Sequence, residues 1–324
     1  MGSVDVALRV ATQADAPALL ESTRAAFAAR RPLDPPAEAL SDDLSAVRAA
    51  LAPPDFGVIA EVGGAIAGSL LVRRAGEPPA QATLRRVNVA SGFRGSGIAS
   101  LMVRQTLLRL ADAGVRRVCV TAREELPELV AWWRSRGFAA SATTREGVIL
   151  CLDTPRPIQV PTADDMRALG AVLATRLRPG DLLVADGELG AGKTTLAQGL
   201  AAGLGVERPI LSPTFVLARV HPSRGAGPAL VHVDAYRLGS AAELDDMDLD
   251  ATAEDAVTFV EWGAGFVEQL SPERLDVIIT RSPDPDESTR TVYLLGVGPR
   301  WAQTGLDRLA DEVAHRDDDE EHAS

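Results

Sequence analysis

A glycine-rich segment, GELGAGKTT at residues 187–195, constrains most strongly what this chain of 324 residues can fold into. It follows the short apolar run DLLVAD and precedes the helical pattern KTTLAQGLAAGLG. The pattern G-x-x-x-x-G-K-[ST] is met by Gly187, Gly192, Lys193 and Thr194. Glycines in this pattern let main-chain N–H groups curl around phosphate oxygens, and the following helix points its positive end at the same anion. The segment therefore predicts a strand, a phosphate-binding loop and a helix.

Lys193 is the only lysine of the chain, in which Lys and Arg together number 33. A lysine places a compact charge between the outer phosphates, whereas the planar fork of an arginine does not fit inside such a loop. The alternative is a chance match in a Gly-rich turn, but the strand-loop-helix context and the solitary lysine favour phosphate. We predict ATP binding by Gly187, Glu188, Leu189, Gly190, Ala191, Gly192, Lys193, Thr194 and Thr195, with Lys193 also catalytic and the Thr194 hydroxyl a Mg²⁺ ligand.

Two acidic residues stand at the ends of later apolar strands. Asp234 closes the strand in LVHVDAYRL, and Glu261 closes the strand in VTFVEWG. Alone, each would be a solvated strand end. The carboxyl ends of neighbouring parallel strands converge, so with the loop we expect both to be catalytic and to bind magnesium. Thr214 in LSPTF offers a switch-like hydroxyl as a further candidate metal ligand.

Taken in order, GELGAGKTT, SPTF, HVDAYRL and EWG resemble the TsaE family over roughly residues 157–300. This resemblance implies a weak ATPase in which Thr194 and Glu261 hold magnesium and Asp234 is the Walker B acid. It further implies action with the TsaB and TsaD proteins, which transfer a threonylcarbamoyl group to an adenosine beside the tRNA anticodon. Glu188 stands where the family usually has Asp, and Gly263 where Pro is usual.

The first part of the chain carries a second loop of this kind, in NVASGFRGSGIASLMVRQ (88–105). A plain β–α turn is the alternative, but the loop precedes a helix and fits a pyrophosphate approached by main-chain N–H groups. Residues 5–150 resemble the GNAT acyltransferases, with the expected order βααβββαβαββ and a helix expected over 35–51. The resemblance implies acetyl-CoA binding by Val89, Arg94, Gly95, Ser96, Gly97, Ile98 and Ala99.

Catalysis by this first region stays open. Trp133 stands where many GNAT enzymes carry a tyrosine as general acid, and tryptophan has only an N–H donor. Glu61 is a candidate general base, although a surface glutamate on a strand is the simpler interpretation.

The proline-rich stretch 151–166 indicates a boundary near Thr154. We predict a GNAT-like domain over 1–153, a P-loop ATPase domain over 154–300, and a short helix with a disordered acidic tail over 301–324. The fold class is α/β: a mixed sheet with flanking helices, followed by a P-loop NTPase-like parallel sheet with helices.

The net charge of −12 disfavours a direct grip on nucleic acid, so tRNA would be met only indirectly. No signal peptide and no apolar run of membrane-spanning length are visible, which predicts a soluble, cytoplasmic protein without a membrane partner. Cys119 and Cys151 lie in short apolar runs and are expected to be core thiols and not a disulfide.

Three hypotheses follow from these patterns. The first is an ATPase subunit of tRNA threonylcarbamoylation fused to an acetyl-CoA-binding region. The second is an N-acetyltransferase for a protein terminus or small amine, with an accessory ATPase domain. The third is that the first region is a docking module for the second.

Overall fold

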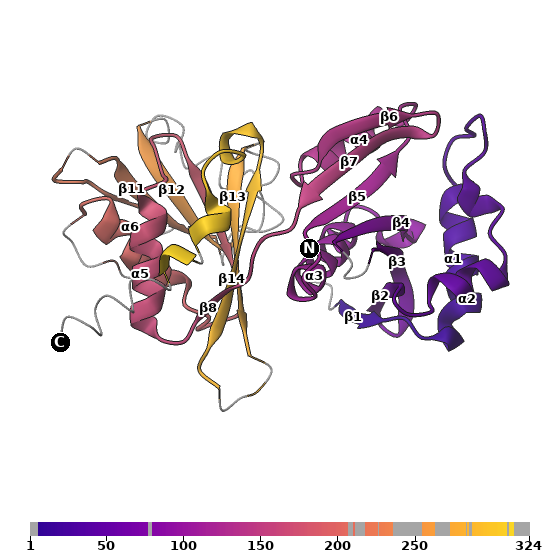
Figure 1. Cartoon of the computed structure of the whole chain (residues 1–324), viewed down its shortest axis with the longest axis horizontal. Helices are drawn as coiled ribbons and strands as arrows, with labels where there is room; N and C mark the ends of the chain where they lie inside the picture. Colours follow the sequence, from indigo (N-terminus) through magenta and orange to yellow (C-terminus); the bar gives the residue numbers. More distant parts are fainter. Residues whose placement is uncertain are drawn as a thin grey trace. The chain divides into compact units, whose positions relative to one another are not determined.

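A computed structural model describes residues 6–76, 80–206, 210, 218–225, 227–235, 255–262, 273–282, 284, 287–309 and 311–313. The chain divides into two compact units (Figure 1). The first comprises residues 1–134 and 138–154, and the second comprises 155–324 with 135–137. Each unit contains one seven-stranded sheet, and both are of the predicted α/β class. The predicted residue Thr214, Gly263 of the EWG segment and the acidic tail at 317–321 lie outside the described residues.

The first unit has the predicted element order, βααβββαβαββ. Its sheet runs β1-β2-β3-β4-β5-β7-β6 and is mixed, because β4 is antiparallel to β3 and parallel to β5. The strands are β1 (Ala7–Val10), β2 (Phe56–Val62), β3 (Ala65–Ala75), β4 (Gln81–Val89), β5 (Arg117–Ala122), β6 (Ala139–Thr144) and β7 (Gly147–Asp153). The helices are α1 (Ala16–Ala28), α2 (Leu44–Ala50), α3 (Ile98–Asp112) and α4 (Pro127–Arg134).

The strands β4 and β5 pair over only part of their length. Their pairing runs from Gln81 to Leu84 on β4, but β4 continues to Val89. Within that continuation the β3–β4 register shifts, and Arg86 takes φ 54°. A bulge of this kind bends and twists a strand. Residues 85–89 of β4 therefore form no ladder of hydrogen bonds with β5.

The helix expected over 35–51 is wrong in its extent. A 3₁₀ turn occupies Glu38–Leu40, and the α-helix α2 begins only at Leu44. The carboxylate of Asp43 accepts a 2.8 Å hydrogen bond from the Ala46 N–H, which caps the helix at that point. The residue that caps α2 therefore lies inside segment 35–51, which the apolar spacing predicted to be a single helix.

The expectation of two free core thiols is also wrong. Cys119 on β5 and Cys151 on β7 form a disulfide, and the two residues are direct partners in the antiparallel β5–β7 ladder. Directly opposed residues on antiparallel strands lie close enough for such a bond. The strand register that opposes them is not visible in the sequence.

The second unit has a central parallel layer with antiparallel edges. The sheet order is β10-β11-β12-β9-β13-β14-β8, in which β11, β12, β9 and β13 are parallel. Thus the sheet is mixed, and the predicted parallel layer forms its middle. The elements are β8 (Ile158–Val160), α5 (Ala163–Ala174), β9 (Leu182–Asp186), α6 (Lys193–Gly203), β10 (Ala218–His221), β11 (Ala229–Asp234), β12 (Ala256–Glu261), β13 (Arg274–Arg281) and β14 (Arg290–Val297).

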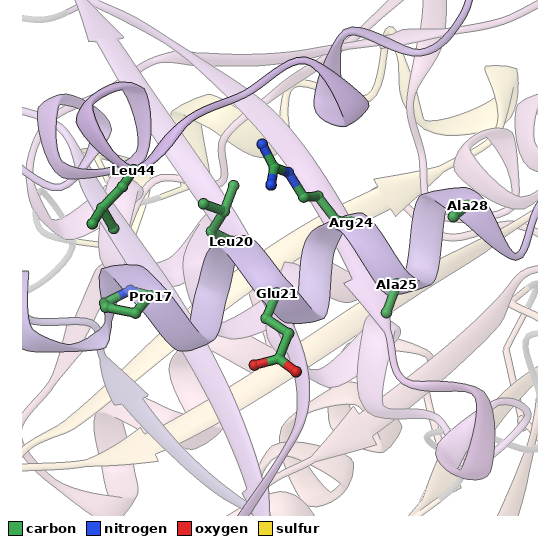
Figure 2. A pocket seen from close by; sticks show the side chains of 7 residues that line it. All are labelled: Pro17, Leu20, Glu21, Arg24, Ala25, Ala28 and Leu44. Atoms are coloured by element: carbon green, nitrogen blue, oxygen red, sulfur yellow. The ribbon is translucent and has the colours of Figure 1, made fainter.

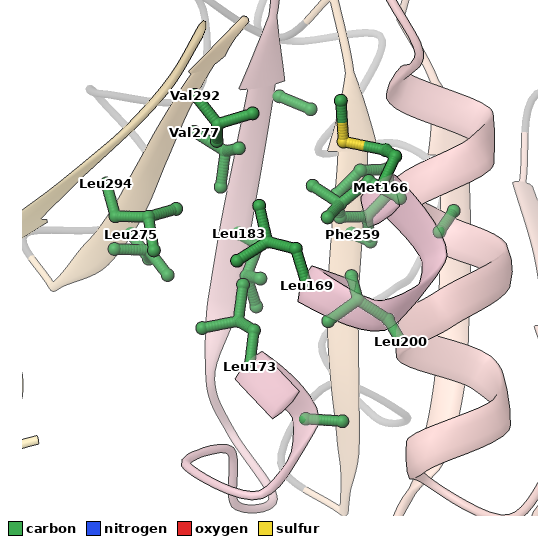
Figure 3. Packing of buried hydrophobic residues seen from close by; sticks show 14 of the residues in the cluster. Met166, Leu169, Leu173, Leu183, Leu200, Phe259, Leu275, Val277, Val292 and Leu294 are labelled. Atoms are coloured by element: carbon green, nitrogen blue, oxygen red, sulfur yellow. The ribbon is translucent and has the colours of Figure 1, made fainter. Parts of the chain in front are cut away.

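The core of the second unit lies between this sheet and the helix pair α5 and α6. Figure 3 shows Leu169 and Leu173 of α5 and Leu200 of α6 packed with Leu183 of β9 and Phe259 of β12. All five side chains are buried. The strand β9 is thus covered and held centrally, and the loop that follows it starts from a rigid base.

Glycines let α5 and α6 approach one another closely. A Cβ at Gly199 of α6 would lie 2.2 Å from the Arg167 carbonyl oxygen, and one at Gly170 of α5 would lie 2.5 Å from the Leu196 carbonyl oxygen. Neither position can hold a larger residue without moving backbone. The helix that begins at the glycine loop is therefore fixed against α5.

After β14 the described chain returns onto the second unit in 3₁₀ turns at Pro299–Trp301 and Leu306–Arg308. Arg300 donates to the buried carboxylate of Asp181 at 2.7 Å, and Trp301 is buried. Among the residues that the structure describes, no helix combines the length and the apolar character needed to cross a bilayer.

Candidate nucleotide site

The glycine loop leaves β9 and enters α6 in a conformation that requires its glycines. Gly187, Gly190 and Gly192 have φ of 155°, 74° and 109°. A Cβ at Gly187 would lie 2.5 Å from the carbonyl oxygen of Ile279 on the neighbouring strand β13. The Ala191 N–H donates to the Glu188 carbonyl and closes the turn. The first N–H groups of α6 have no partners within the helix, so the loop and helix start form an anion cradle.

The ammonium of Lys193 lies within this cradle. It donates to the carbonyl oxygens of Gly187 at 2.6 Å and Glu188 at 3.0 Å, and it lies 3.6 Å from the ring centroid of Trp262. Lys193 is only 4% exposed. Burial lowers the pKa of the ammonium, against the nearby carboxylates of Glu261 and others, which raise it. A bound polyphosphate would add further negative charge beside this ammonium.

Trp262 follows Glu261 directly and takes φ 62°, which is unusual for a large side chain. Its N–H donates to the Ala185 carbonyl at the end of β9. The indole ring therefore lies against the Lys193 ammonium.

The predicted metal ligands Thr194 and Glu261 are in contact. The Thr194 hydroxyl lies 2.8 Å from Glu261 Oε1, which joins the first turn of α6 to the end of β12. Glu261 is 3% exposed, and Asp234 is its direct partner in the parallel β11–β12 ladder. The two acids thus stand side by side at the carboxyl ends of their strands, and Asp234 is also buried.

The donor set fits a magnesium ion bound together with a nucleotide. Within the described residues no group of three or more His, Cys, Asp and Glu side chains could hold a metal by itself. Magnesium commonly takes one or two protein oxygens and completes its shell with water and substrate phosphates. Thr194 Oγ1 and Glu261 Oε1 are two such oxygens beside the cradle, and Asp234 stands next to them.

Two residues of this site were not predicted. His232, also on β11, has Nε2 2.9 Å from Glu261 Oε1. Arg281 at the end of β13 donates to the Leu189 carbonyl and lies 4.0 Å from the Glu188 carboxylate. A histidine inside an apolar strand gives no signal of its own, and the approach of Arg281 depends on β13 lying beside β9.

The predicted acetyl-CoA loop lies between β4 and α3. Gly95 and Gly97 have φ of 78° and 79°, and apart from their chain neighbours no described residue comes within 4 Å of a Cβ built at either. Residues 94–97 are exposed, and Ile98 is buried as the first residue of α3. Val89 ends β4 just before the loop, and Ala99 lies in the first turn of α3. The predicted residues thus form one open loop at a helix start.

Positive charge gathers near this loop. Arg30 donates to the Val87 carbonyl of β4 at 3.3 Å, and its guanidinium lies 3.9 Å from the ring centroid of Phe27. Burial lowers the Arg30 pKa, and the neighbouring charge of Arg94 lowers it further. Two guanidinium groups within reach of one another suit an anionic ligand such as a pyrophosphate.

Two residues of the first unit, Trp133 and Glu61, were considered for acid–base catalysis. Trp133 is 2% exposed and packs edge-on against Phe138, so it is a core residue. Glu61 of β2 accepts a 2.8 Å hydrogen bond from Arg9 of β1. The glutamate is therefore held in an ion pair between the two neighbouring strands β1 and β2.

A groove of the first unit runs along α1 and reaches Leu44 of α2. Figure 2 shows its lining, which is mostly apolar and comprises Pro17, Leu20, Glu21, Arg24, Ala25, Ala28 and Leu44. None of these residues belongs to a predicted site.

The second unit defines a P-loop nucleotide-binding protein: a buried strand, a glycine cradle, a helix start with lysine and threonine, and acids on adjacent parallel strands. Comparison with known proteins agrees. A family model described as "Threonylcarbamoyl adenosine biosynthesis protein TsaE" matches residues 160–292, and one described as "Acetyltransferase (GNAT) family" matches residues 17–138.

Relatives of the chain include TsaE proteins, and the solved structures similar to it include an N-acetyltransferase. The chain is 54% identical over 147 residues to the tRNA threonylcarbamoyladenosine biosynthesis protein TsaE of Streptomyces coelicolor, covering 45% of this chain and 99% of that protein. It is 36% identical over 155 residues to TsaE of Bacillus subtilis, covering 48% and 90%. The PaiA N-acetyltransferase of Thermoplasma acidophilum, solved with coenzyme A, is 11% identical with a TM-score of 0.40, covering 45% and 98%. The chain belongs to the TsaE family and carries a GNAT-like region before its TsaE region.

Proposed function

We propose that this chain is the ATP-binding and hydrolysing subunit of tRNA threonylcarbamoylation, fused to an acetyl-CoA-binding GNAT-like domain. The observation that carries the proposal is the junction of Lys193, Thr194 and Glu261 at one glycine cradle. Family membership supports the pathway, since the relatives are named for threonylcarbamoyladenosine biosynthesis. The proposed domains are 1–153 and 154–300, followed by 301–324.

Each residue of the cradle has a stated task in this proposal. The main-chain N–H groups of residues 187–195 hold the phosphates of ATP, and Lys193 leaves the carbonyls of Gly187 and Glu188 to meet the outer phosphates. Thr194 and Glu261, with Asp234 beside them, would hold Mg²⁺, and a bound Mg²⁺ would supply charge stabilisation for the phosphates. The carboxylates of Glu261 and Asp234 also orient the attacking water.

The proposed partners are the TsaB and TsaD proteins, which would carry out the transfer to tRNA while ATP hydrolysis resets the complex. Contact with tRNA is indirect, because a chain of net charge −12 does not favour the phosphate backbone. A role in tRNA modification would place the chain in the cytoplasm.

Reconstitution tests this function. TsaB and TsaD of the same organism would be combined with tRNA, ATP and the threonylcarbamoyl donor, with and without this chain, and modified adenosine followed by mass spectrometry of nucleosides. We expect repeated turnovers with the wild-type chain and with Arg219→Ala, which removes an exposed charge on β10. Lys193→Ala is expected to act like omission of the chain. Equal modification with Lys193→Ala would contradict the proposal.

A second function, acetyl-CoA binding with or without acyl transfer, is favoured by the open loop at 94–97 and the parting of β4 from β5. Trp133 supports acetyl-CoA binding over acyl transfer, because a buried indole offers no general acid. Gly95→Asp would place a carboxylate in the open space where the pyrophosphate is proposed to lie, and Gly95→Asn is its neutral match. Both residues tolerate a positive φ. Calorimetry should give acetyl-CoA affinity lowered about 10-fold or more by Asp and little changed by Asn. Equal affinities would place the ligand elsewhere.

A further inference from the structure

His232 is a buried polar residue inside β11, whose only other polar residue is Asp234 at its end. It lies on β11, two residues before Asp234, and is 0% exposed. Its ring packs beside that of Phe259, with centroids 5.6 Å apart. An apolar side chain would fill such a position without the cost of burying an imidazole. A buried polar group of this kind calls for an explanation.

His232 and the Thr194 hydroxyl contact the same oxygen atom of the Glu261 carboxylate. Glu261 Oε1 lies 2.9 Å from His232 Nε2 and 2.8 Å from Thr194 Oγ1. An ionised carboxylate only accepts, so Nε2 carries the hydrogen and donates to it. The other ring nitrogen, Nδ1, has no hydrogen-bond partner among the described residues. The only hydrogen bond that the ring makes within this part of the chain therefore serves Glu261.

We propose that His232 is a positioning residue that holds the Glu261 carboxylate against Thr194, in the orientation that a magnesium ion requires. This inference rests on the proposed function, in which Glu261 and Thr194 are metal ligands. Without the Nε2–H donor, the Thr194 hydroxyl would be the carboxylate's one remaining hydrogen-bond partner among the described residues. Outer-shell partners of ligating carboxylates commonly change metal affinity about 10- to 100-fold when removed.

Two substitutions separate the donor from the shape of the ring. His232→Phe keeps a flat ring of similar size and removes the donor, whereas His232→Gln places an amide N–H near the position of Nε2. His232→Asn is a further variant, polar but too short to reach Glu261. Thermal unfolding of each variant would establish which of them fold.

The measurement is the affinity for a non-hydrolysable ATP analogue, determined by calorimetry on the full chain with excess Mg²⁺ and with excess chelator. The ratio of the two affinities reports metal binding and not nucleotide binding. We expect His232→Phe and His232→Asn to lower this ratio about 10-fold and His232→Gln to keep it within about 3-fold of wild type, while the affinity in chelator stays unchanged in all.

The outcomes separate this inference from the function on which it rests. A wild-type ratio of one, unchanged in Glu261→Gln, would overturn the metal assignment itself. A wild-type ratio that falls in Glu261→Gln but not in His232→Phe or His232→Asn would overturn the role of His232 alone. A uniform loss of affinity with and without Mg²⁺ would reveal a merely structural role and would also overturn it.

Discussion

The Thr194 hydroxyl and the Glu261 carboxylate lie 2.8 Å apart, although 67 residues separate them in the chain. Thr194 lies in the first turn of α6, and Glu261 ends β12, the strand next to β9. This contact joins a hydroxyl of the P-loop helix to a buried acid at the end of β12.

Removing the Thr194 hydroxyl or a Glu261 carboxylate oxygen should slow ATP hydrolysis and leave nucleotide binding almost unchanged. Thr194→Val and Glu261→Gln are each expected to lower the Mg²⁺-dependent rate of ATP hydrolysis about 100-fold, since metal stabilisation of the transition state amounts to several kcal/mol. Phosphate release would measure the rate, and nucleotide affinity in chelator should change little. Thr194→Ser keeps the hydroxyl and is the matched control. Full hydrolysis by Thr194→Val would remove Thr194 from the metal site.

Gly199→Ala should destabilise the second unit, although alanine is the better helix former by about 1 kcal/mol. The new Cβ would lie 2.2 Å from the Arg167 carbonyl oxygen, and moving that backbone costs about 1–3 kcal/mol. Hydrogen exchange of the α6 amides would measure the change. Ala202→Gly, on the exposed side of α6, sets the size of the propensity effect alone. A gain in protection for Gly199→Ala would contradict the close packing of α5 and α6.

The disulfide between Cys119 and Cys151 should stabilise the oxidised first unit. It closes a separation of 32 residues, and such links typically contribute about 2–4 kcal/mol. Reductant is expected to increase hydrogen exchange in β5 and β7 of the wild type and to leave a Cys119→Ala, Cys151→Ala double variant unchanged. Thiol titration of the unfolded, unreduced chain should give no free thiol. Two free thiols after gentle oxidation would refute the pairing.

The contact of Asp15 with Arg9 should make the first unit sensitive to acid. Hydrogen bonds from the Arg9 guanidinium hold the pKa of the Asp15 carboxyl well below its ordinary value of 3.8, and those from Thr12 lower it further. A carboxyl whose pKa is lowered by folding contributes stability above its unfolded pKa and loses it as the pH falls below that value. Asp15→Asn should therefore cost about 1 kcal/mol at pH 7, and its difference from wild type should shrink below about pH 4. Hydrogen exchange of α1 at several pH values would measure it; a difference independent of pH would refute the ion pair.

The glycine loop could be predicted because its chemistry is contiguous in sequence. Asp234 and Glu261 were predictable because each closes an apolar strand, and parallel strands of one layer end on the same side. By contrast, the role of His232 depends on the register that sets Asp234 opposite Glu261, and no local pattern fixes that register. Arg281 reaches the loop only because β13 lies beside β9 in a sheet whose order differs from chain order.

In the first unit too, features set by local sequence could be predicted and features set by strand pairing could not. The order of its elements follows from local apolar periodicity and turn residues, and it was predicted. The start of α2 at Leu44 was missed because its capping residue lies within a longer apolar pattern. The opposition of Cys119 to Cys151 was missed because it is a property of strand pairing.

Equilibrium binding of Mg²⁺·ATP to the purified chain, by calorimetry, tests the central claim most directly. One site per chain is expected in the wild type and in Arg219→Ala. In Lys193→Ala the affinity should fall about 10- to 100-fold, because a charge-assisted contact to phosphate is lost from a buried cradle. An affinity for ATP that is the same in Lys193→Ala and wild type would contradict the account.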